Sequence, residues 1–295
     1  MKISVLIAAF RAAPTIAAAI ASVQSQTHRD WELVVVEDGS HDGTENIVRG
    51  LASRDAHSVR YENLGRNQGV AAARNRLLDL ATAGVVAFLD ADDLWSAEHL
   101  ATGSRLLAAG AGLVVAGVHT FDLATGHALG DVLPPASLAV DPVGTLFAES
   151  VIVTSSCVLL TRDLASRTGA FDPGFRVGED RDYWLRAALA RGRFAIEPAV
   201  TCHYAKHAGS TMGRTLLVAA QTVRFYEKYF HLAAVPASAR RRQLARSLAN
   251  EARLLRATDA RASARQLWRA WRLTPGNVAL ATHLAFSGGR ALFRP

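Results

Sequence analysis

Apolar runs alternate with amphipathic segments through the first third of the chain. The runs are rich in Val, Ile and Leu, as expected of buried strands. The segments between them carry apolar positions at helical spacing, as Ile16, Ile20 and Val23 do. We therefore expect strands at residues 3–10, 31–37, 59–62 and 85–89, and helices at residues 14–24, 44–52 and 69–83.

This alternation of strand and helix predicts an α/β fold with an open, mostly parallel sheet and helices on both faces. Ligands of such sheets bind at the carboxyl ends of the strands. Acidic clusters at residues 37–38 and 90–93 directly follow two of the expected strands. The pattern therefore predicts a ligand site at that edge.

The rest of the chain is less regular up to about residue 210 and helical beyond residue 215. Pro134-Pro135 and Asp141-Pro142 mark loops in the middle part. We expect strands at residues 113–119 and 156–160, and helices at residues 183–190, 243–255, 262–273 and 278–286.

Composition narrows the class of protein. Half of the 295 residues are apolar and 20% are charged, which excludes wholesale disorder. Cys157 and Cys202 are too few for a disulfide scaffold or a thiolate zinc site, and they fit a reducing cytosol. The sequence contains no apolar stretch long enough for a transmembrane helix. Its opening could pass for a signal peptide, but Arg11 and Pro14 interrupt the apolar run, which favours a strand.

Charge is unevenly distributed along the chain. Residues 236–295 contain 12 of the 33 basic residues and only two acids, Glu251 and Asp259. This segment therefore has a net charge of +10, the rest of the chain has −3, and the whole chain has +7. Such a tail suggests an anionic partner surface, either membrane lipid or nucleic acid. The alternative is a helical cap whose arginines are simply solvated.

Three acids in D-A-D-D are the first candidates for chemistry. Asp90 and Asp92 at a strand end repel each other unless a cation is present. A small set of carboxylate ligands suits Mg²⁺ or Mn²⁺, which keep open positions for phosphate oxygens. The alternative is a solvated acidic turn in which Asp93 or Ser96 caps the next helix.

Asp38 and Arg74 are candidates for binding a ligand near the sheet edge. Asp38 can accept a hydrogen bond from a ligand, and Gly39 allows close backbone approach. Arg74, in N-x-G-x(4)-R-N, can reach an anion from the start of a helix. The alternatives are an ordinary D-G turn and a surface arginine after a helix cap.

Two later clusters carry further candidates. Asp180 lies in Gly178-Glu179-Asp180-Arg181-Asp182, where one carboxylate can act as a general base, or all can simply form a charged helix start. His207 can ligate a metal and Lys206 can bind phosphate. The sequence lacks G-x-S-x-G, Walker A and G-x-G-x-x-G motifs, which argues against hydrolase, P-loop and Rossmann dehydrogenase functions.

The order of these motifs resembles that of the family 2 inverting glycosyltransferases. The resemblance rests on the motifs V-V-V-E-D-G-S, N-x-G-x(4)-R-N, L-D-A-D-D, G-E-D-x-D-Y-W-L-R and H-Y-x-K-H, and it covers roughly residues 1–215. The resemblance implies a GT-A fold with a nucleotide-binding half at about residues 1–100 and an acceptor half at residues 101–215. Residues 216–295 would form a basic helical appendage.

The resemblance also implies the role of each site residue. Asp180 would be the catalytic base, Asp92 and His207 would hold Mn²⁺ or Mg²⁺, and the remaining site residues would contact the nucleotide sugar, namely Ala8, Phe10, Asp38, Arg74, Asp90 and Lys206. The family often has Tyr-Arg before the histidine. Here Ala205 follows Tyr204, so the diphosphate contact would fall to Lys206.

The expected activity is metal-dependent, inverting transfer of a sugar, from a UDP-linked donor, to a hydroxyl of a glycan or lipid-linked acceptor, as in cell-surface polysaccharide synthesis. We expect a cytoplasmic protein that can lie on the inner face of the plasma membrane through residues 236–295. Two alternatives are a catalytically silent nucleotide-sugar-binding protein and a nucleic-acid-binding protein. The tail lacks interleaved stacking aromatics, so no nucleic acid is expected.

Overall fold

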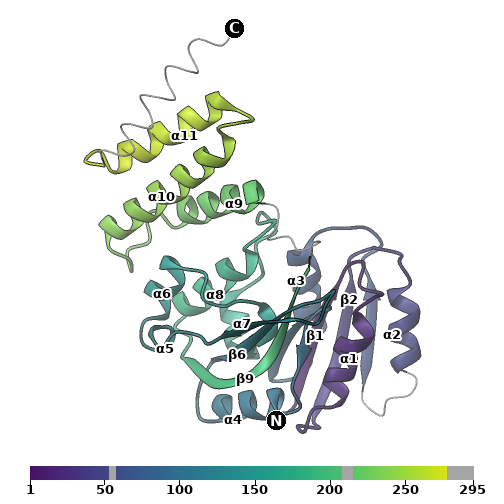
Figure 1. The fold of residues 1–295 in the computed structure, drawn as a ribbon. Coiled ribbons are helices and arrows are strands. Elements are labelled where there is room, and N and C mark those ends of the chain that lie inside the picture. The colour runs from purple at the N-terminus through teal and green to yellow at the C-terminus, as the bar shows by residue number, and fades with distance from the viewer. Residues whose placement is uncertain (53–57, 208–214, 278–295) are drawn as a thin grey trace. The chain divides into compact units, whose positions relative to one another are not determined.

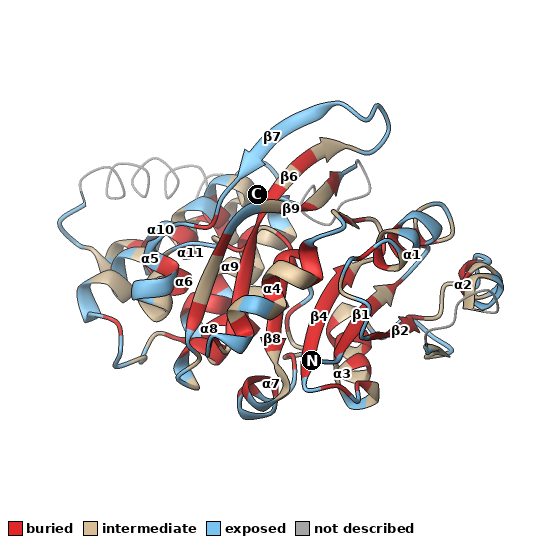
Figure 2. Ribbon diagram, turned by 90° about the horizontal axis from the view of Figure 1, so that it is seen from below, coloured by how far each residue is buried: buried red, intermediate tan, exposed pale blue. Residues whose placement is uncertain are grey.

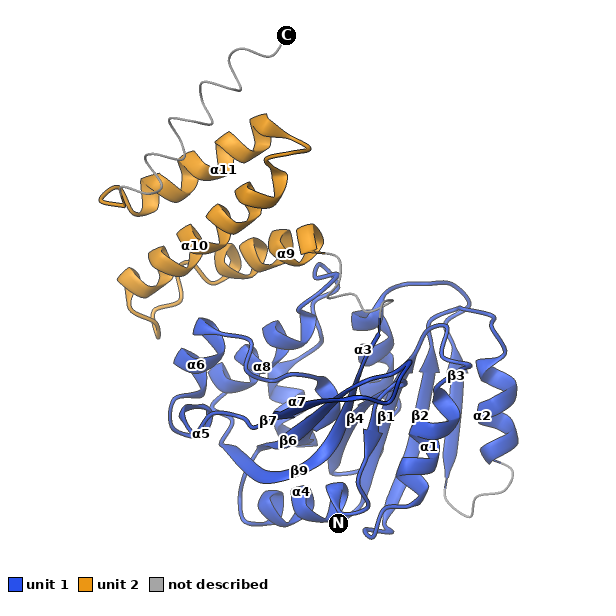
Figure 3. Ribbon diagram, in the orientation of Figure 1, with its two compact units in different colours: residues 1–208 blue, residues 209–295 orange. Residues whose placement is uncertain are grey.

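The computed structural model describes residues 1–52, 58–207 and 215–277. It divides into two compact units, residues 1–208 and residues 209–295, which Figure 3 shows in blue and orange. No helix within these described ranges is long and apolar enough to cross a bilayer.

Nine strands of unit 1, within its described residues, form one sheet in the order β3-β2-β1-β4-β8-β6-β9-β5, with β7 paired to β6. β1, β2 and β4 are buried on both faces, as their apolar sequences require (Figure 2). The strands are β1 (Ile3–Ala9), β2 (Trp31–Glu37), β3 (Val59–Asn63), β4 (Val85–Asp90), β5 (Leu94–Trp95), β6 (Leu113–Asp122), β7 (Ala128–Val132), β8 (Val158–Thr161) and β9 (Phe194–Lys206).

Parallel pairing holds throughout the first half of the sheet and returns once in the second. β1 lies between β2 and β4, and all three run in the same direction. β8 then inserts antiparallel to both β4 and β6, whereas β9 runs parallel to β6. The second half of the sheet is therefore mixed, because β8 runs antiparallel to both of its neighbours.

Helices cover both faces of the sheet (Figure 1). α3 packs on β1 and β2, and α4 packs on β6 and β9. The helical elements of unit 1 are α1 (Ile16–Gln24), α2 (Thr44–Ala52), α3 (Val70–Leu80), α4 (His99–Ala108), α5 (Ser137–Val140), α6 (Pro142–Ala148), the 3₁₀ turn η1 (Ser155–Cys157), α7 (Arg162–Thr168) and α8 (Glu179–Leu189).

Unit 2 contains three described helices, α9 (Thr215–Lys228), α10 (Ala237–Leu255) and α11 (Ala260–Leu273). α10 packs against both of the others. α11 turns Ser263, Leu267 and Ala270 inward, and Asp259 caps it by accepting from the Ala262 amide. The apolar contacts between α10 and α11 give these arginine-rich sequences a core of their own.

The expected α/β class is confirmed, and so are most of the expected elements. The strand at residues 31–37 and the helix at residues 44–52 have the expected bounds. The helix expected at residues 183–190 instead begins at Glu179, so the acidic residues form its first turn rather than preceding it. The helix expected at residues 278–286 lies outside the described residues.

Candidate active site

The carboxyl ends of β1, β2 and β4 meet at one edge of the sheet. Ala9 is in register with Glu37 on β2, and Ala8 is in register with Asp90 on β4. Asp38 follows β2 directly, so it lies about two strand spacings, roughly 10 Å, from the end of β4. The two acidic clusters expected at strand ends therefore share this edge.

Asp38 anchors the loop that leads into α3. Its carboxylate accepts hydrogen bonds from the backbone amides of Gln68 at 2.6 Å and Gly69 at 2.8 Å. Gly39 has φ +69°, and a Cβ there would lie 2.5 Å from the Arg66 Cα. Only glycine lets the two loops approach this closely. Asp38 is itself buried, with 3% of its surface exposed.

Arg74 joins the end of β4 to the start of α8. Its side chain, on α3, is buried, and it donates to Asp90 Oδ1 at 2.8 Å and to Glu179 Oε1 at 2.6 Å. Its guanidinium also lies over the Phe171 ring, 5.6 Å from the centroid. A planar fork of donors can satisfy two carboxylates at once, which a single ammonium does less well.

The first turn of α8 holds two acids in an unfavourable setting. Gly178, with φ +80°, precedes Glu179 and Asp180. Burial raises the pKa of Asp180, and the Arg74 guanidinium only partly offsets that rise. Burial and the neighbouring Asp180 charge raise the pKa of Glu179 to about 7, against the lowering effect of Arg74. A carboxylate with a raised pKa is a stronger base than usual.

Asp93 closes the base of the site. It is fully buried, and its carboxylate lies 2.8 Å from Thr154 Oγ1 and accepts from Ser156 Oγ at 2.6 Å and from the Ala205 amide at 3.0 Å. These contacts tie β4, η1 and β9 together. Asp93 is therefore a structural acid, and it positions the end of β9 beside Asp92.

Asp92 and His207 form a partly exposed pair at the same edge of the sheet. Asp92 Oδ2 lies 3.0 Å from His207 Nε2, and the two side chains are 33% and 34% exposed. Burial and the charge of Asp90 raise the pKa of Asp92. Lys206 is exposed at the end of β9, one residue before His207.

A divalent cation fits this pair. One carboxylate and one imidazole are acceptable ligands for Mn²⁺ or Mg²⁺, and two protein ligands leave positions for phosphate oxygens and water. A cation would also relieve the repulsion that raises the pKa of Asp92. Within residues 1–52, 58–207 and 215–277, no group of three or more His, Cys, Asp or Glu side chains is placed to hold a metal by itself.

The structure gathers most of the expected site residues at one edge. Asp90, Arg74 and the start of α8 are joined by ion pairs, and Asp92 and His207 by their contact. Ala8 is in register with Asp90, and Phe10 is 44% exposed just beyond β1. Asp38 lies two strands from Asp90, and its carboxylate contacts the loop before α3.

Sequence reasoning missed Thr154, Ser156 and the partnership of Glu179 with Arg74. Thr154, Ser155 and Ser156 interrupt an otherwise apolar stretch from Val151 to Leu160, and this interruption could have signalled buried polar contacts. No signal within the sequence pairs Glu179 with a residue 105 positions earlier.

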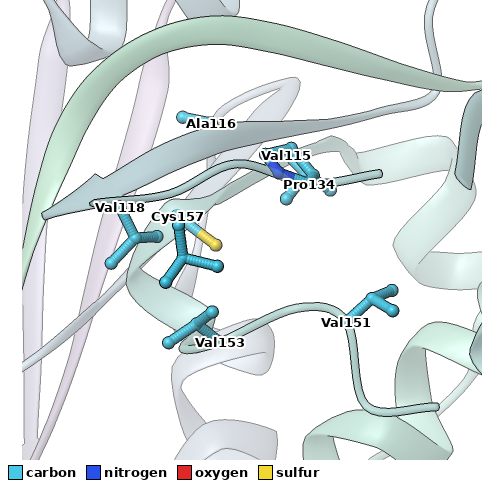
Figure 4. Close-up of a pocket in the computed structure, with 8 residues that line it drawn as sticks. Val115, Ala116, Val118, Pro134, Val151, Val153 and Cys157 are labelled. Atoms are coloured by element: carbon cyan, nitrogen blue, oxygen red, sulfur yellow. The ribbon is translucent and has the colours of Figure 1, made fainter. Parts of the chain in front are cut away.

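The two cysteines are buried behind the polar edge. Cys157 lines an apolar pocket below β6, with Val115, Ala116, Val118, Val132, Pro134, Val151 and Val153 (Figure 4). Burial raises the pKa of the Cys157 thiol to about 12, and burial also raises that of Cys202. Both thiols are buried and reduced, so neither is a nucleophile at neutral pH.

The chain is similar to a known protein family and to curated proteins. The family model described as Glycosyl transferase family 2 matches residues 4–164, which is more than half of the chain. One curated relative is the UDP-Glc:alpha-D-GlcNAc-diphosphoundecaprenol beta-1,3-glucosyltransferase WfgD of Escherichia coli, 37% identical over 98 residues. That alignment covers 33% of this chain and 38% of the relative, so the chain matches little more than a third of that protein's length.

Two solved structures share the fold. S. aureus TarS 1–349 in complex with UDP-GlcNAc superposes with a TM-score of 0.70 at 18% identity, over 95% of this chain and 84% of that one. The mannosyltransferase PcManGT from Pyrobaculum calidifontis, in complex with GDP-Man and Mn²⁺, gives a TM-score of 0.62 at 21% identity, over 97% and 84%. The expected GT-A fold is confirmed by this likeness.

Proposed function

Because the chain belongs to glycosyl transferase family 2, we propose that it transfers a sugar from a nucleoside diphosphate, UDP in the first instance, to a hydroxyl group of a glycan or lipid-linked acceptor. The observation that carries this proposal is the gathering of Asp90, Asp92 and the first turn of α8 at one sheet edge. WfgD, whose name specifies a UDP-sugar donor and a diphosphoundecaprenol-linked acceptor, supports the substrate classes. Assembly of cell-surface polysaccharide is the fitting context.

Asp180 removes the proton from the acceptor hydroxyl. The acceptor oxygen forms a bond to the anomeric carbon as the bond from that carbon to the diphosphate breaks, and the pair of electrons leaves with the nucleoside diphosphate. A single in-line displacement of this kind inverts the anomeric centre. The raised pKa of Asp180 suits it to accept a proton from an alcohol at neutral pH.

Asp92 and His207 hold the divalent cation in this proposal. When bound, Mn²⁺ or Mg²⁺ supplies positive charge that stabilises the leaving diphosphate. PcManGT, solved with GDP-Man and Mn²⁺, supports a metal in this fold. Lys206, exposed beside His207, is placed to add a second positive charge near the phosphates.

The nucleoside lies along the ends of β1 and β2. Asp38 accepts a hydrogen bond from the base at its exposed edge, Ala8 and the exposed Phe10 provide apolar contact, and Asp90 faces the sugar. Residues 1–100 then form the nucleotide-binding half and residues 101–215 the acceptor half of one catalytic domain. Residues 216–295 form a separate basic region.

Transfer can be tested directly with the full chain. The chain is incubated with Mn²⁺, a panel of UDP-sugars and a diphosphoundecaprenol-linked acceptor, and lipid-linked product is measured by mass spectrometry. We expect product with one donor and none in EDTA. UDP binding without product from any donor would favour the catalytically silent alternative.

The outer face of α11 fits an anionic membrane surface. Arg261, Arg265, Trp268 and Arg272 recur at helical spacing opposite the buried face of this helix. Trp268 is 48% exposed, and the Arg272 guanidinium lies 4.7 Å from its ring centroid. Arginines beside an exposed tryptophan match the polar–apolar boundary of a bilayer that carries anionic lipids.

Vesicle co-sedimentation tests this face. Replacing Arg261, Arg265 and Arg272 with Gln should weaken binding to phosphatidylglycerol vesicles by about tenfold or more, since each arginine contributes about 1 kcal/mol. Replacing three exposed arginines of unit 1, Arg49, Arg105 and Arg167, removes the same charge and should change binding much less. Equal losses, or tighter binding to RNA than to vesicles, would contradict a membrane role for α11.

A further inference from the structure

The Arg74–Glu179 ion pair connects two parts of the chain that the reaction must bring together. Arg74 is 4% exposed, with one terminal nitrogen on Asp90 and the other on Glu179. Asp90 ends the strand that leads to the cation ligand Asp92, and Glu179 precedes Asp180 on the first turn of α8. The guanidinium therefore links the donor side of the edge to the helix that carries the base.

The contacts of Arg74 leave it little capacity to bind a donor directly. Both terminal nitrogens are engaged, and the face of the guanidinium lies over Phe171. Breaking these contacts would leave two carboxylates without their cationic partner, and one of them, Glu179, is buried, which is costly. A role inside the protein is therefore a better fit than the nucleotide contact implied by the family resemblance.

We propose that Arg74 and Glu179 are positioning residues that fix the first turn of α8 against the end of β4, and so hold Asp180 at the donor-binding edge. This inference rests on the proposed function, because it takes Asp180 as the base. The ion pair sets where the base is, and the charge of Arg74 partly offsets the rise that burial causes in the pKa of Asp180. Neither residue touches the reacting atoms in this assignment.

The position of a base matters because proton transfer needs hydrogen-bond reach. A displacement of about 1 Å can lower a rate about 100-fold. Glu179 has the geometry to prevent such a displacement, since its carboxylate is held at 2.6 Å by a buried cation. The next arginine of α3, Arg76, instead pairs with Glu62 at 2.7 Å near the surface. That second pair is a matched control on the same helix.

The first test is the isosteric variant Glu179→Gln. We expect kcat to fall about 10–100-fold while the affinity for UDP in Mn²⁺, measured by calorimetry, changes less than about threefold. Arg74→Lys, which keeps the charge but loses the fork, should behave in the same way. Glu62→Gln should leave kcat, KM and UDP affinity unchanged, because its ion pair lies away from the base.

The second test is the pH dependence of kcat. The charged and titratable groups around Asp180 are Arg74 from α3, Asp90 from β4, Cys157 from η1, and Glu179 and Arg181 from its own helix. Of these, Arg74 is the cation that favours ionised Asp180. Arg74→Gln should therefore move the acid limb of the profile to higher pH, whereas Arg74→Lys should leave the limb in place and lower only its height.

The outcomes separate this inference from the proposed function. If the unaltered chain transfers no sugar, the proposed function fails first. If it transfers sugar and Glu179→Gln keeps full kcat, the positioning role is wrong. The role is equally wrong if Glu179→Gln and Arg74→Lys lose UDP affinity and thermal stability in parallel with kcat, because that pattern marks a purely structural pair. Should Arg74→Gln fail to fold, the other two variants still decide.

Discussion

Buried carboxylates at the two ends of the sheet have pKa shifts in opposite directions. At the amino ends of the strands, Glu32 on β2 accepts from Ser4, Lys2 and both the amide and hydroxyl of Thr82. Burial would raise its pKa, but these hydrogen bonds outweigh burial and lower the pKa from 4.5 to about 2. At the carboxyl ends, burial and mutual repulsion raise the pKa values of Asp92, Asp93, Glu179 and Asp180, whereas hydrogen bonds lower the pKa values of the more exposed Asp42 and Glu62.

This contrast separates an acid that stabilises the fold from acids that are held at a cost. Glu32 has enough donors to keep its charge buried. At the other end, Asp90 and Glu179 share one buried arginine, Arg74, and Asp92 lies against the imidazole of His207. Because positive charge is scarce at this edge, binding of a cation there would be favourable, and the bound cation could in turn bind a polyanionic ligand.

Removing the charge of Asp180 should produce the largest effect. Asp180→Asn keeps the size of the side chain but cannot take a proton, so we expect kcat to fall by about three to four orders of magnitude. UDP affinity should stay close to that of the unaltered chain, and stability should not fall, because the substitution removes a charge that burial disfavours. Steady-state kinetics and calorimetry measure the two quantities.

Asp163→Asn is the control, since that acid is exposed on α7 and pairs with the nearby Arg167. The control should retain full turnover. Turnover by Asp180→Asn within about tenfold of the unaltered chain would show that another group acts as base.

The same contrast shows why part of the fold could be predicted from sequence. β1, β2 and β4 can be recognised in the sequence as continuous apolar runs, because parallel strands in the middle of a sheet are buried on both faces. Their acidic ends follow from the same local pattern. Asp90, Asp92 and Asp38 could therefore be placed at one edge before any coordinates were known.

The second half of the molecule depends on contacts that local patterns do not encode. β9 extends over 13 residues with a mixed burial pattern and shifts register against β6, so no simple period identifies it. β7 is exposed along its whole length. The Arg74–Glu179 ion pair and the Asp93–Thr154 contact join residues 105 and 61 positions apart, and only the folded chain brings them together.

Neutralising Asp92 should have the next largest effect, on UDP binding. It also tests the contrast between the acids at the two ends of the sheet. We expect Asp92→Asn to weaken UDP binding in Mn²⁺ by about 100-fold, since the carboxylate ligand is lost. Its thermal stability should equal or exceed that of the unaltered chain, because burial and Asp90 already disfavour the charge. Calorimetric titration with UDP and thermal unfolding measure these effects.

EDTA provides the matched condition for this variant. The unaltered chain in EDTA should bind UDP as weakly as Asp92→Asn does in Mn²⁺. If EDTA leaves the UDP affinity of the unaltered chain intact, Asp92 and His207 do not hold a cation that the nucleotide needs.

At the opposite end of the sheet, Glu32→Gln should cost stability and not activity. The lowered pKa means that ionised Glu32 stabilises the fold above pH 4.5, and that this contribution is lost as the pH falls towards 2. At about 1.4 kcal/mol per pH unit, with allowance for partial compensation, the variant should lose about 2–3 kcal/mol at pH 7. Urea unfolding at pH 7 and at low pH measures the difference, with the exposed Glu45→Gln as a control that should change little. A Glu32→Gln deficit of the same size at both pH values would mean that packing, not charge, holds this end together, and the two ends would then differ less than their pKa shifts indicate.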